Sequence, residues 1–145
     1  MYYSTNNEIL KRYITEPEIL DYIEFTQEMP TYLEKYQVLA KVLVQDVFYF
    51  HHGLKFCSKK CLDYIRGKIM IDGGAYMGDS ASVLLHHYSP SKVVSFDVSP
   101  VNYNLYMSTM IRNRFDASKF AFHLIGLSDR LKINNIDIKQ VDSDC

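Results

Sequence analysis

The chain has 145 residues, 48% of them hydrophobic, and a length of this order predicts one domain with one core. Its 16 basic and 17 acidic side chains give a formal net charge of −1, which does not favour nucleic acid or an acidic membrane surface as a partner. No apolar run approaches the ~18 residues of a membrane-spanning helix and the first residues lack a signal-peptide pattern, so we expect a cytoplasmic protein that acts on small molecules.

Residues 1–66 are expected to form a helical lead-in that packs on a sheet. The segment Thr15–Glu18 resembles a capping box with a proline in the first turn, and apolar residues at helical spacing follow it. Thr31, directly after Pro30, repeats the capping pattern, which predicts a second helix that runs to about Val44.

The end of the lead-in carries a short strand-like segment and a further helix start. Residues 47–50 are aromatic and β-favouring, which indicates a short strand. Ser58 is expected to cap the helix that follows. Cys57 and Cys61 are predicted to be thiols of a reducing compartment. The adjacent His51 and His52 would point to opposite faces of a strand, so no metal site is expected here.

From Lys68 onward the pattern alternates between strands and helices. The predicted elements are a strand at 69–71, a helix from about Gly78 to His87, a strand at 93–96, a helix from Pro100 and a strand at 120–125. Near-continuously apolar strands separated by helices indicate a parallel sheet covered on both faces. Right-handed crossovers then give the strand order 3-2-1. The expected fold class is α/β with a Rossmann-like parallel sheet, residues 67–145 being its N-terminal half.

The residues after 130 indicate only one further element. Residues 131–138 alternate enough for one more strand or hairpin arm. A doubly wound domain normally continues with further strands that carry the substrate pocket. We therefore expect the chain to be a fragment or a shortened form of such a domain.

A glycine-rich turn follows the first predicted strand, and it can be interpreted in two registers. As Gly73-x-Ala75-x-x-Gly78, it approximates a dinucleotide-binding turn. In that register Asp72 would face a pyrophosphate, which argues against it. In the other register, Asp72-x-Gly74-x-Tyr76-x-Gly78, the acid at the strand end faces the ammonium of an amino-acid-like ligand. This second register favours S-adenosylmethionine, which also carries a positive sulfonium.

A second acid stands at the end of the next predicted strand. Asp97 follows the apolar residues 93–96 and lies 25 residues after Asp72. Because parallel strands end at the same edge of a sheet, both acids are expected there together. Asp72 then suits the methionine end of the ligand, and Asp97 suits the ribose hydroxyls.

Three segments together resemble the FkbM-type S-adenosylmethionine-dependent methyltransferases. They are residues 71–80, 94–103 and 123–129, in that order and at matching spacing. The resemblance implies a truncated methyltransferase fold that methylates a hydroxyl of a sugar or other small molecule. Position by position, it also implies cofactor contacts from a methionine-side loop, a ribose-binding acid and a loop beside the adenine: Asp72, Gly74, Ala75, Tyr76 and Gly78 in the first, then Asp97, then Ser128.

Two other interpretations stay open. One is a non-catalytic remnant or interaction module of the same fold, which associates with itself through an exposed sheet edge. The other is an NAD(P)-binding Rossmann fragment, against which Asp72 and the register argue. No general base is assigned, because a surface or packing role is favoured for each of the five histidines.

Overall fold

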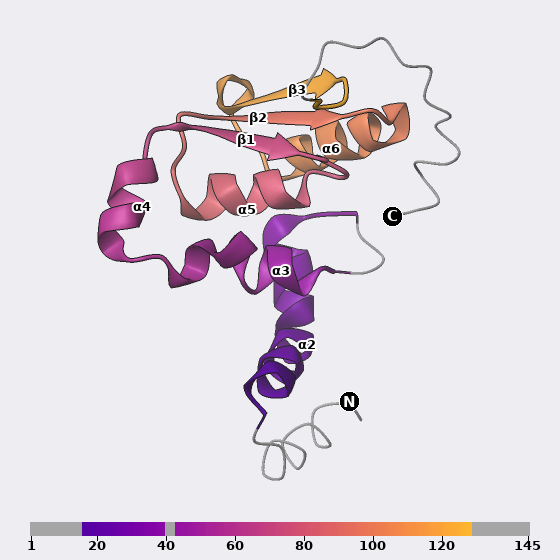
Figure 1. Cartoon of the computed structure of the whole chain (residues 1–145). Coiled ribbons are helices and arrows are strands. Elements are labelled where there is room, and N and C mark those ends of the chain that lie inside the picture. The colour runs from indigo at the N-terminus through magenta and orange to yellow at the C-terminus, as the bar shows by residue number, and fades with distance from the viewer. Residues whose placement is uncertain (1–15, 40–42, 129–145) are drawn as a thin grey trace.

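The computed structural model describes residues 16–39 and 43–128, which form an α/β arrangement with a three-stranded parallel sheet (Figure 1). The strands are β1 (Ile69–Gly73), β2 (Lys92–Asp97) and β3 (Phe120–Leu124), in the order β1-β2-β3. The predicted α/β class and parallel sheet are confirmed, and the order agrees with the predicted 3-2-1. This arrangement is compatible with a Rossmann-like core.

Two helices connect the strands and lie on the same side of the sheet (Figure 1). Helix α5 (Asp79–His87) joins β1 to β2, and α6 (Pro100–Arg112) leads toward β3 through the short 3-10 helix η2 (Ala117–Lys119). Helix α6 begins as the sequence predicts, because the Ser99 side chain accepts a hydrogen bond from the Asn102 amide and Pro100 occupies the first helical turn.

Only one face of the sheet is covered within the described residues, whereas the sequence predicted helices on both faces. Val93 packs with Tyr106 and Met110 in the core between the sheet and the helices, and all three are fully buried. On the opposite face, Ile69 and Ile71 are 61% and 62% exposed. The apolar strands misled the prediction, because both right-handed crossovers place their helices on one face and leave the other open.

The N-terminal part forms a second core beside α5. Helix α2 (Pro17–Tyr36) buries Phe25, Tyr32 and Tyr36 on one face. These rings pack on the short helix α3 (Gln45–Phe48), with the Tyr36 and Phe48 ring centres 5.3 Å apart. Figure 1 shows α3 beneath α5 and α2 extending away from the sheet, and Val83 of α5 completes this aromatic core.

Two helix boundaries in this part differ from the prediction. Helix α2 runs without a break through Pro30, so no second helix starts at Thr31. Pro30 removes one backbone hydrogen bond from the helix. The packing of aromatic side chains on both sides of Pro30 offsets this loss. The helix ends before the left-handed Gln37 (φ 51°) instead of at Val44. Its N-cap is Glu16, which makes no side-chain cap, and Thr15 lies outside the described residues.

Residues 47–50 do not form the predicted strand, because Val47 and Phe48 belong to α3. Short apolar runs do not distinguish a strand from a buried helical turn. The 3-10 helix η1 (His51–Phe56) and α4 (Lys59–Ile65) follow, and the predicted cap is confirmed because Ser58 Oγ accepts from the Cys61 amide at 3.3 Å. The predicted element at 131–138 lies outside the described residues. Among the described helices, none has both the length and the apolarity that a membrane span requires.

Candidate functional site

The loop between β1 and α5 is tied to the end of β2 by its own amides. The amides of Gly74 and Ala75 donate to the Phe96 carbonyl at 2.9 and 3.0 Å. The next amide, that of Tyr76, donates to Asp97 Oδ2 at 2.9 Å. Gly74 and Tyr76 have left-handed backbone (φ 78° and 41°), which allows successive amides to turn toward β2. Three consecutive donors are therefore used inside the protein.

Asp97 is the hub of this end of the sheet. Its Oδ1 accepts from the Ser99 amide at 2.9 Å, and the Asn102 side-chain amide lies 3.3 Å from Oδ1 and 3.2 Å from Oδ2. With the Tyr76 amide on Oδ2, each oxygen has two donors. A carboxylate offers about four acceptor positions, so Asp97 is saturated by protein groups. The acid thereby joins the glycine loop to the first turn of α6.

A hollow of about 330 Å³ opens at this end of the sheet and is called here the strand-end hollow. Its walls combine apolar side chains from the ends of β2 and β3 with the polar pair Asp97 and Asn102. A Cβ at Gly126 would lie 3.1 Å from Val98 Cγ1, so the lack of a side chain at this position lets the two segments lie close together. The lining residues are Gly73, Gly74, Tyr76, Phe96, Asp97, Val98, Asn102, Ile125, Gly126 and Leu127.

A larger hollow, of about 490 Å³, lies beside β1 and is called here the β1 hollow. Gly73 lines both hollows, so they meet at the end of β1. The β1 hollow is bounded by β1, η1, α4 and α5. Its lining residues are His52, Leu54, Ile65, Met70, Ile71, Asp72, Gly73, Ser80 and Leu84.

Asp72 lies between the sheet and the helices and is only 8% exposed. Ser95 Oγ donates to Asp72 Oδ2 at 3.1 Å and also lies 3.1 Å from the Tyr106 hydroxyl. Burial raises the pKa of Asp72 to about 6, although the bond from Ser95 and the nearby His52 oppose this shift. Burial also raises the pKa of Asp79, which accepts from the Ser80 amide at 2.8 Å. Two buried acids thus stand where β1 passes into α5.

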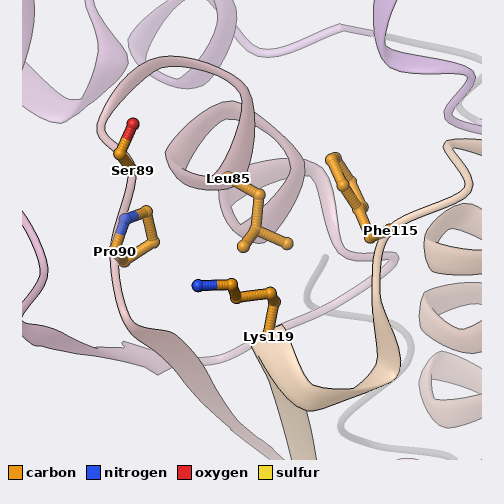
Figure 2. A pocket seen from close by; sticks show the side chains of 5 residues that line it. All are labelled: Leu85, Ser89, Pro90, Phe115 and Lys119. Carbon is orange, nitrogen blue, oxygen red and sulfur yellow. The ribbon is translucent and has the colours of Figure 1, made fainter.

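A third hollow, of about 270 Å³, lies at the opposite end of the strands. Figure 2 shows Lys119 extending across it toward Pro90, below Leu85 and beside Phe115. Ser89 and Pro90 precede β2, and Lys119 precedes β3. This hollow therefore contains none of the predicted site residues.

The structure brings together some of the predicted site residues and separates others. Gly74, Tyr76 and Asp97 line the strand-end hollow, and Asp72 lines the β1 hollow. Three others lie elsewhere: Ala75 is fully buried against the helices, Gly78 is the buried N-cap of α5, and Ser128 is exposed just beyond the lining residue Leu127.

Sequence reasoning missed two polar partners of the predicted acids. Asn102 bonds Asp97, and its signal was its place three residues after the Ser99 cap, where a first-turn side chain faces the end of the preceding strand. Ser95 bonds Asp72 from the next strand, because the register pairs these two residues side by side. A serine inside an apolar strand is the signal that could have revealed this contact.

None of the described histidines lines the strand-end hollow. His51 bonds the Tyr88 hydroxyl at 2.8 Å, and His86 bonds Asn113 at 2.9 Å. His123 stacks on Phe96 on the open face of the sheet. His52, on the rim of the β1 hollow, lies 2.8 Å from Ser80 Oγ. Within the described ranges, no three His, Cys, Asp or Glu side chains are grouped to hold a metal ion.

Comparison of the chain with family models, curated proteins and solved structures found no match. The α/β architecture is shown by the structure itself, through the parallel pairing of β1, β2 and β3. The function proposed for the chain therefore depends on the chemistry of the two hollows.

Proposed function

We propose that this chain binds S-adenosylmethionine and forms the cofactor-binding part of a methyltransferase similar to the FkbM type, acting on a hydroxyl of a sugar or other small molecule. One observation carries the proposal: the end of the sheet combines a partly apolar hollow with two buried acids and with loop amides that are already bonded. Such a site favours a cationic ligand with a flat apolar part over a phosphate.

The loop amides disfavour a dinucleotide. A pyrophosphate needs free backbone N–H groups at the glycine loop and at the start of the following helix. The amides of Gly74, Ala75 and Tyr76 donate to β2 instead. The Asp79 carboxylate occupies the first turn of α5, where it accepts from the Ser80 amide. A negative side chain in the first turn interacts favourably with the positive end of the helix dipole, and it repels an incoming anion.

The strand-end hollow suits an adenosine group. Phe96, Val98 and Leu127 supply apolar surface for a flat base, and Asp97 supplies a carboxylate for ribose hydroxyls. Because Asp97 is saturated, the ribose would have to replace a protein donor. The two contacts from the Asn102 side chain are the longest at this acid, and they come from a group that can rotate away. The Tyr76 and Ser99 amides would keep the loop in place.

Asp72 and Asp79, the two buried acids where β1 passes into α5, suit the positive end of the same ligand. Asp72 lies one residue before Gly73, which lines both hollows, so a ligand that extends from the strand-end hollow past Gly73 reaches this carboxylate. A ligand cation next to a buried carboxylate compensates for the hydration that the carboxylate loses on burial. A recess with apolar walls followed by negative charge supports the second register of the glycine turn.

S-adenosylmethionine, when bound, supplies a methyl group that its sulfonium has already activated. The contribution of this chain is then to hold the donor and to fix the direction of its methyl group, which lowers the barrier through proximity. Asp97 and the tied loop supply rigid walls, and Asp72 supplies charge. Removal of the acceptor's proton calls for a base, and none is assigned, because Asp97, the carboxylate that lines the strand-end hollow, is expected to hold the ribose.

Calorimetric titration with S-adenosylmethionine, S-adenosylhomocysteine and NAD tests this proposal. We expect saturable heat with the first two and none with NAD. Asp97→Ala should weaken binding at least about tenfold, since it removes a charge-assisted hydrogen bond. Heat with NAD alone would contradict the proposal, and no heat with any of the three would favour the interaction module.

Asn102→Ala is the matched variant, because it separates ribose binding from support of the loop. It removes the donor that the ribose must replace but leaves the Tyr76 and Ser99 amides on Asp97. We expect its affinity for S-adenosylmethionine to equal or exceed that of the parent chain. If Asn102→Ala weakened binding as much as Asp97→Ala, Asp97 would have a structural role only.

A further inference from the structure

The β1 hollow has apolar walls of its own, and the proposed function uses only its acid Asp72. Most of its wall is apolar and comes from four elements, including Leu54 of η1, Ile65 of α4, Met70 of β1 and Leu84 of α5. None of its described lining residues is a lysine or arginine. With a volume of about 490 Å³, it falls within the range of small-molecule sites.

One buried carboxylate in this wall accepts a hydrogen bond from the described residues at only one of its two oxygens. Asp72 is 8% exposed, and its Oδ2 accepts from Ser95. Among the described residues, no group donates a hydrogen bond to the other oxygen, Oδ1. A buried carboxylate with a free acceptor position is costly unless a donor or a cation reaches it. Asp79, buried next to it on α5, adds a second negative charge.

The rim of the hollow is held by backbone that residues other than glycine rarely adopt. His51, His52 and Gly53 are three consecutive residues with positive φ (51°, 53° and 83°). This conformation places His52 Nε2 2.8 Å from Ser80 Oγ, across the mouth between η1 and α5. Left-handed histidines cost free energy, and such strain is found where the surrounding structure must hold a side chain in one place.

We infer that the β1 hollow is a binding site for a small apolar amine, whose ammonium group donates to Asp72 while its hydrocarbon part lies against Leu54, Ile65 and Leu84. The charge of the hollow decides between the ligand classes. An anion would meet Asp72, with the charge of Asp79 behind it on α5, and no described lining residue is a lysine or arginine that would offset these acids. A neutral hydrocarbon would fill the walls but would leave Asp72 Oδ1 without a donor.

This inference does not rest on the proposed function, although both use Asp72. S-adenosylmethionine is expected to depend on Asp97 and the strand-end hollow, whereas the amine is expected to depend on the walls of the β1 hollow. A substitution on the far wall of the β1 hollow should therefore affect amine binding and leave the contacts of Asp97 in place. Ile65→Trp, which fills the β1 hollow from α4, should abolish amine binding.

The test is an NMR titration of the full chain with n-hexylamine, n-hexanol and hexanoate, which share one hydrocarbon length and differ in charge. We expect saturable shifts of the Gly73 and Ser80 amides and of the His52 ring with hexylamine. Hexanol and hexanoate should bind at least about tenfold more weakly, because neither places a positive charge beside Asp72. Equal binding of hexanol, or no shift with hexylamine, would overturn the inference.

Asp72→Asn supplies the decisive comparison, with Asp63→Asn on the exposed side of α4 as its control. Both variants change a carboxylate to an amide of the same shape, but only Asp72 lines the hollow. We expect Asp72→Asn to weaken hexylamine binding at least about tenfold and Asp63→Asn to leave it unchanged. Undiminished binding to a folded Asp72→Asn variant would also overturn the inference.

Discussion

Glycine 78 is the position where the turn between β1 and α5 tolerates no side chain. Its backbone is left-handed (φ 81°), and a Cβ built on it would lie 3.0 Å from Met110 Cε and 3.1 Å from Tyr106 Cδ2. Gly74 in the same turn is also left-handed (φ 78°) but has open space around it. The two residues therefore separate the cost of backbone strain from the cost of a steric clash.

Replacing each of these glycines by alanine gives a matched pair. Gly74→Ala should lower the free energy of unfolding by about 1–2 kcal/mol through strain alone. Gly78→Ala should lower it by at least about 1 kcal/mol more, since α6 must also move to admit the methyl group. Urea denaturation followed by circular dichroism measures both values. Equal losses would mean that Met110 moves aside at no cost.

The sequence predicted the positions of the site residues better than their partners. Asp97 was expected at the end of its strand from the apolar residues before it, and the structure has it there. Its saturation by Tyr76, Ser99 and Asn102 could not be predicted, because hydrogen bonds between loops depend on three-dimensional proximity. The burial of Ala75 could not be predicted for a related reason: a small residue near a ligand-binding turn can equally be a core residue.

At the scale of elements, the contact between α2 and α5 centres on one histidine. His87 Nε2 lies 3.0 Å from Lys35 Nζ and 2.8 Å from the Tyr36 hydroxyl, both on α2. A lysine ammonium has only donors, so Nε2 accepts and the neutral ring carries its proton on Nδ1. Burial lowers the pKa of His87 to about 4, and Lys35 adds to this shift.

The pH dependence of stability should report this contact. Because the folded state keeps His87 neutral, the unfolded state binds more protons between the folded pKa of about 4 and the ordinary value of 6.5. Protonation therefore favours unfolding in this window, and stability falls as the pH falls. We expect His87→Gln to lose less stability than the parent chain between pH 7 and pH 4.5, as measured by chemical denaturation at each pH.

Three other groups near His87, namely His51, His86 and Lys35, are present in both proteins, so the difference between parent and variant isolates the one ring. His123→Gln, on the far face of the sheet, controls for the loss of a histidine outside this contact. If the stability difference between the parent and His87→Gln did not change with pH, the neutral contact with α2 would be contradicted.

The strands and helices after residue 68 were predictable because apolar runs, caps and prolines agree there. Ser99 and Pro100 specified the start of α6, and the three strands follow their apolar runs within one or two residues. The lead-in was harder to predict. Pro30 resembles a helix end, yet aromatic packing on both sides of it keeps α2 continuous. Tertiary contacts therefore override the local signal.

At the scale of the whole molecule, the open face of the sheet is the most unusual surface. Ile69 and Ile71 project from β1 on the side away from α5 and α6, and β1 is also an edge strand of the described sheet. An exposed apolar edge strand is a template for pairing with another chain. Self-association through an exposed sheet edge remains a prediction of the sequence. The structure identifies β1 as the edge strand at which this prediction can be tested.

Ile69→Lys tests this prediction, because a charge on an edge strand opposes pairing. The parent chain should show a concentration-dependent sedimentation coefficient, and Ile69→Lys should sediment as a monomer over the same range. Ile111→Lys is the matched control, since Ile111 is 69% exposed on α6 and away from the sheet. A parent chain that stays monomeric at all concentrations would contradict the prediction.

Helix α5 contacts both the glycine turn and the N-terminal part of the molecule. Its first residue, Asp79, lies beneath the glycine turn, and its last, His87, contacts the lead-in. Its middle residues divide between the two cores, with Val83 in one and Leu84 in the other. Because α5 is one continuous helix of nine residues, a ligand that shifted its first turn would also shift the contact of His87 with the lead-in. By thermodynamic reciprocity, whatever the ligand does to the docking of the lead-in, the docked lead-in does to the affinity for the ligand.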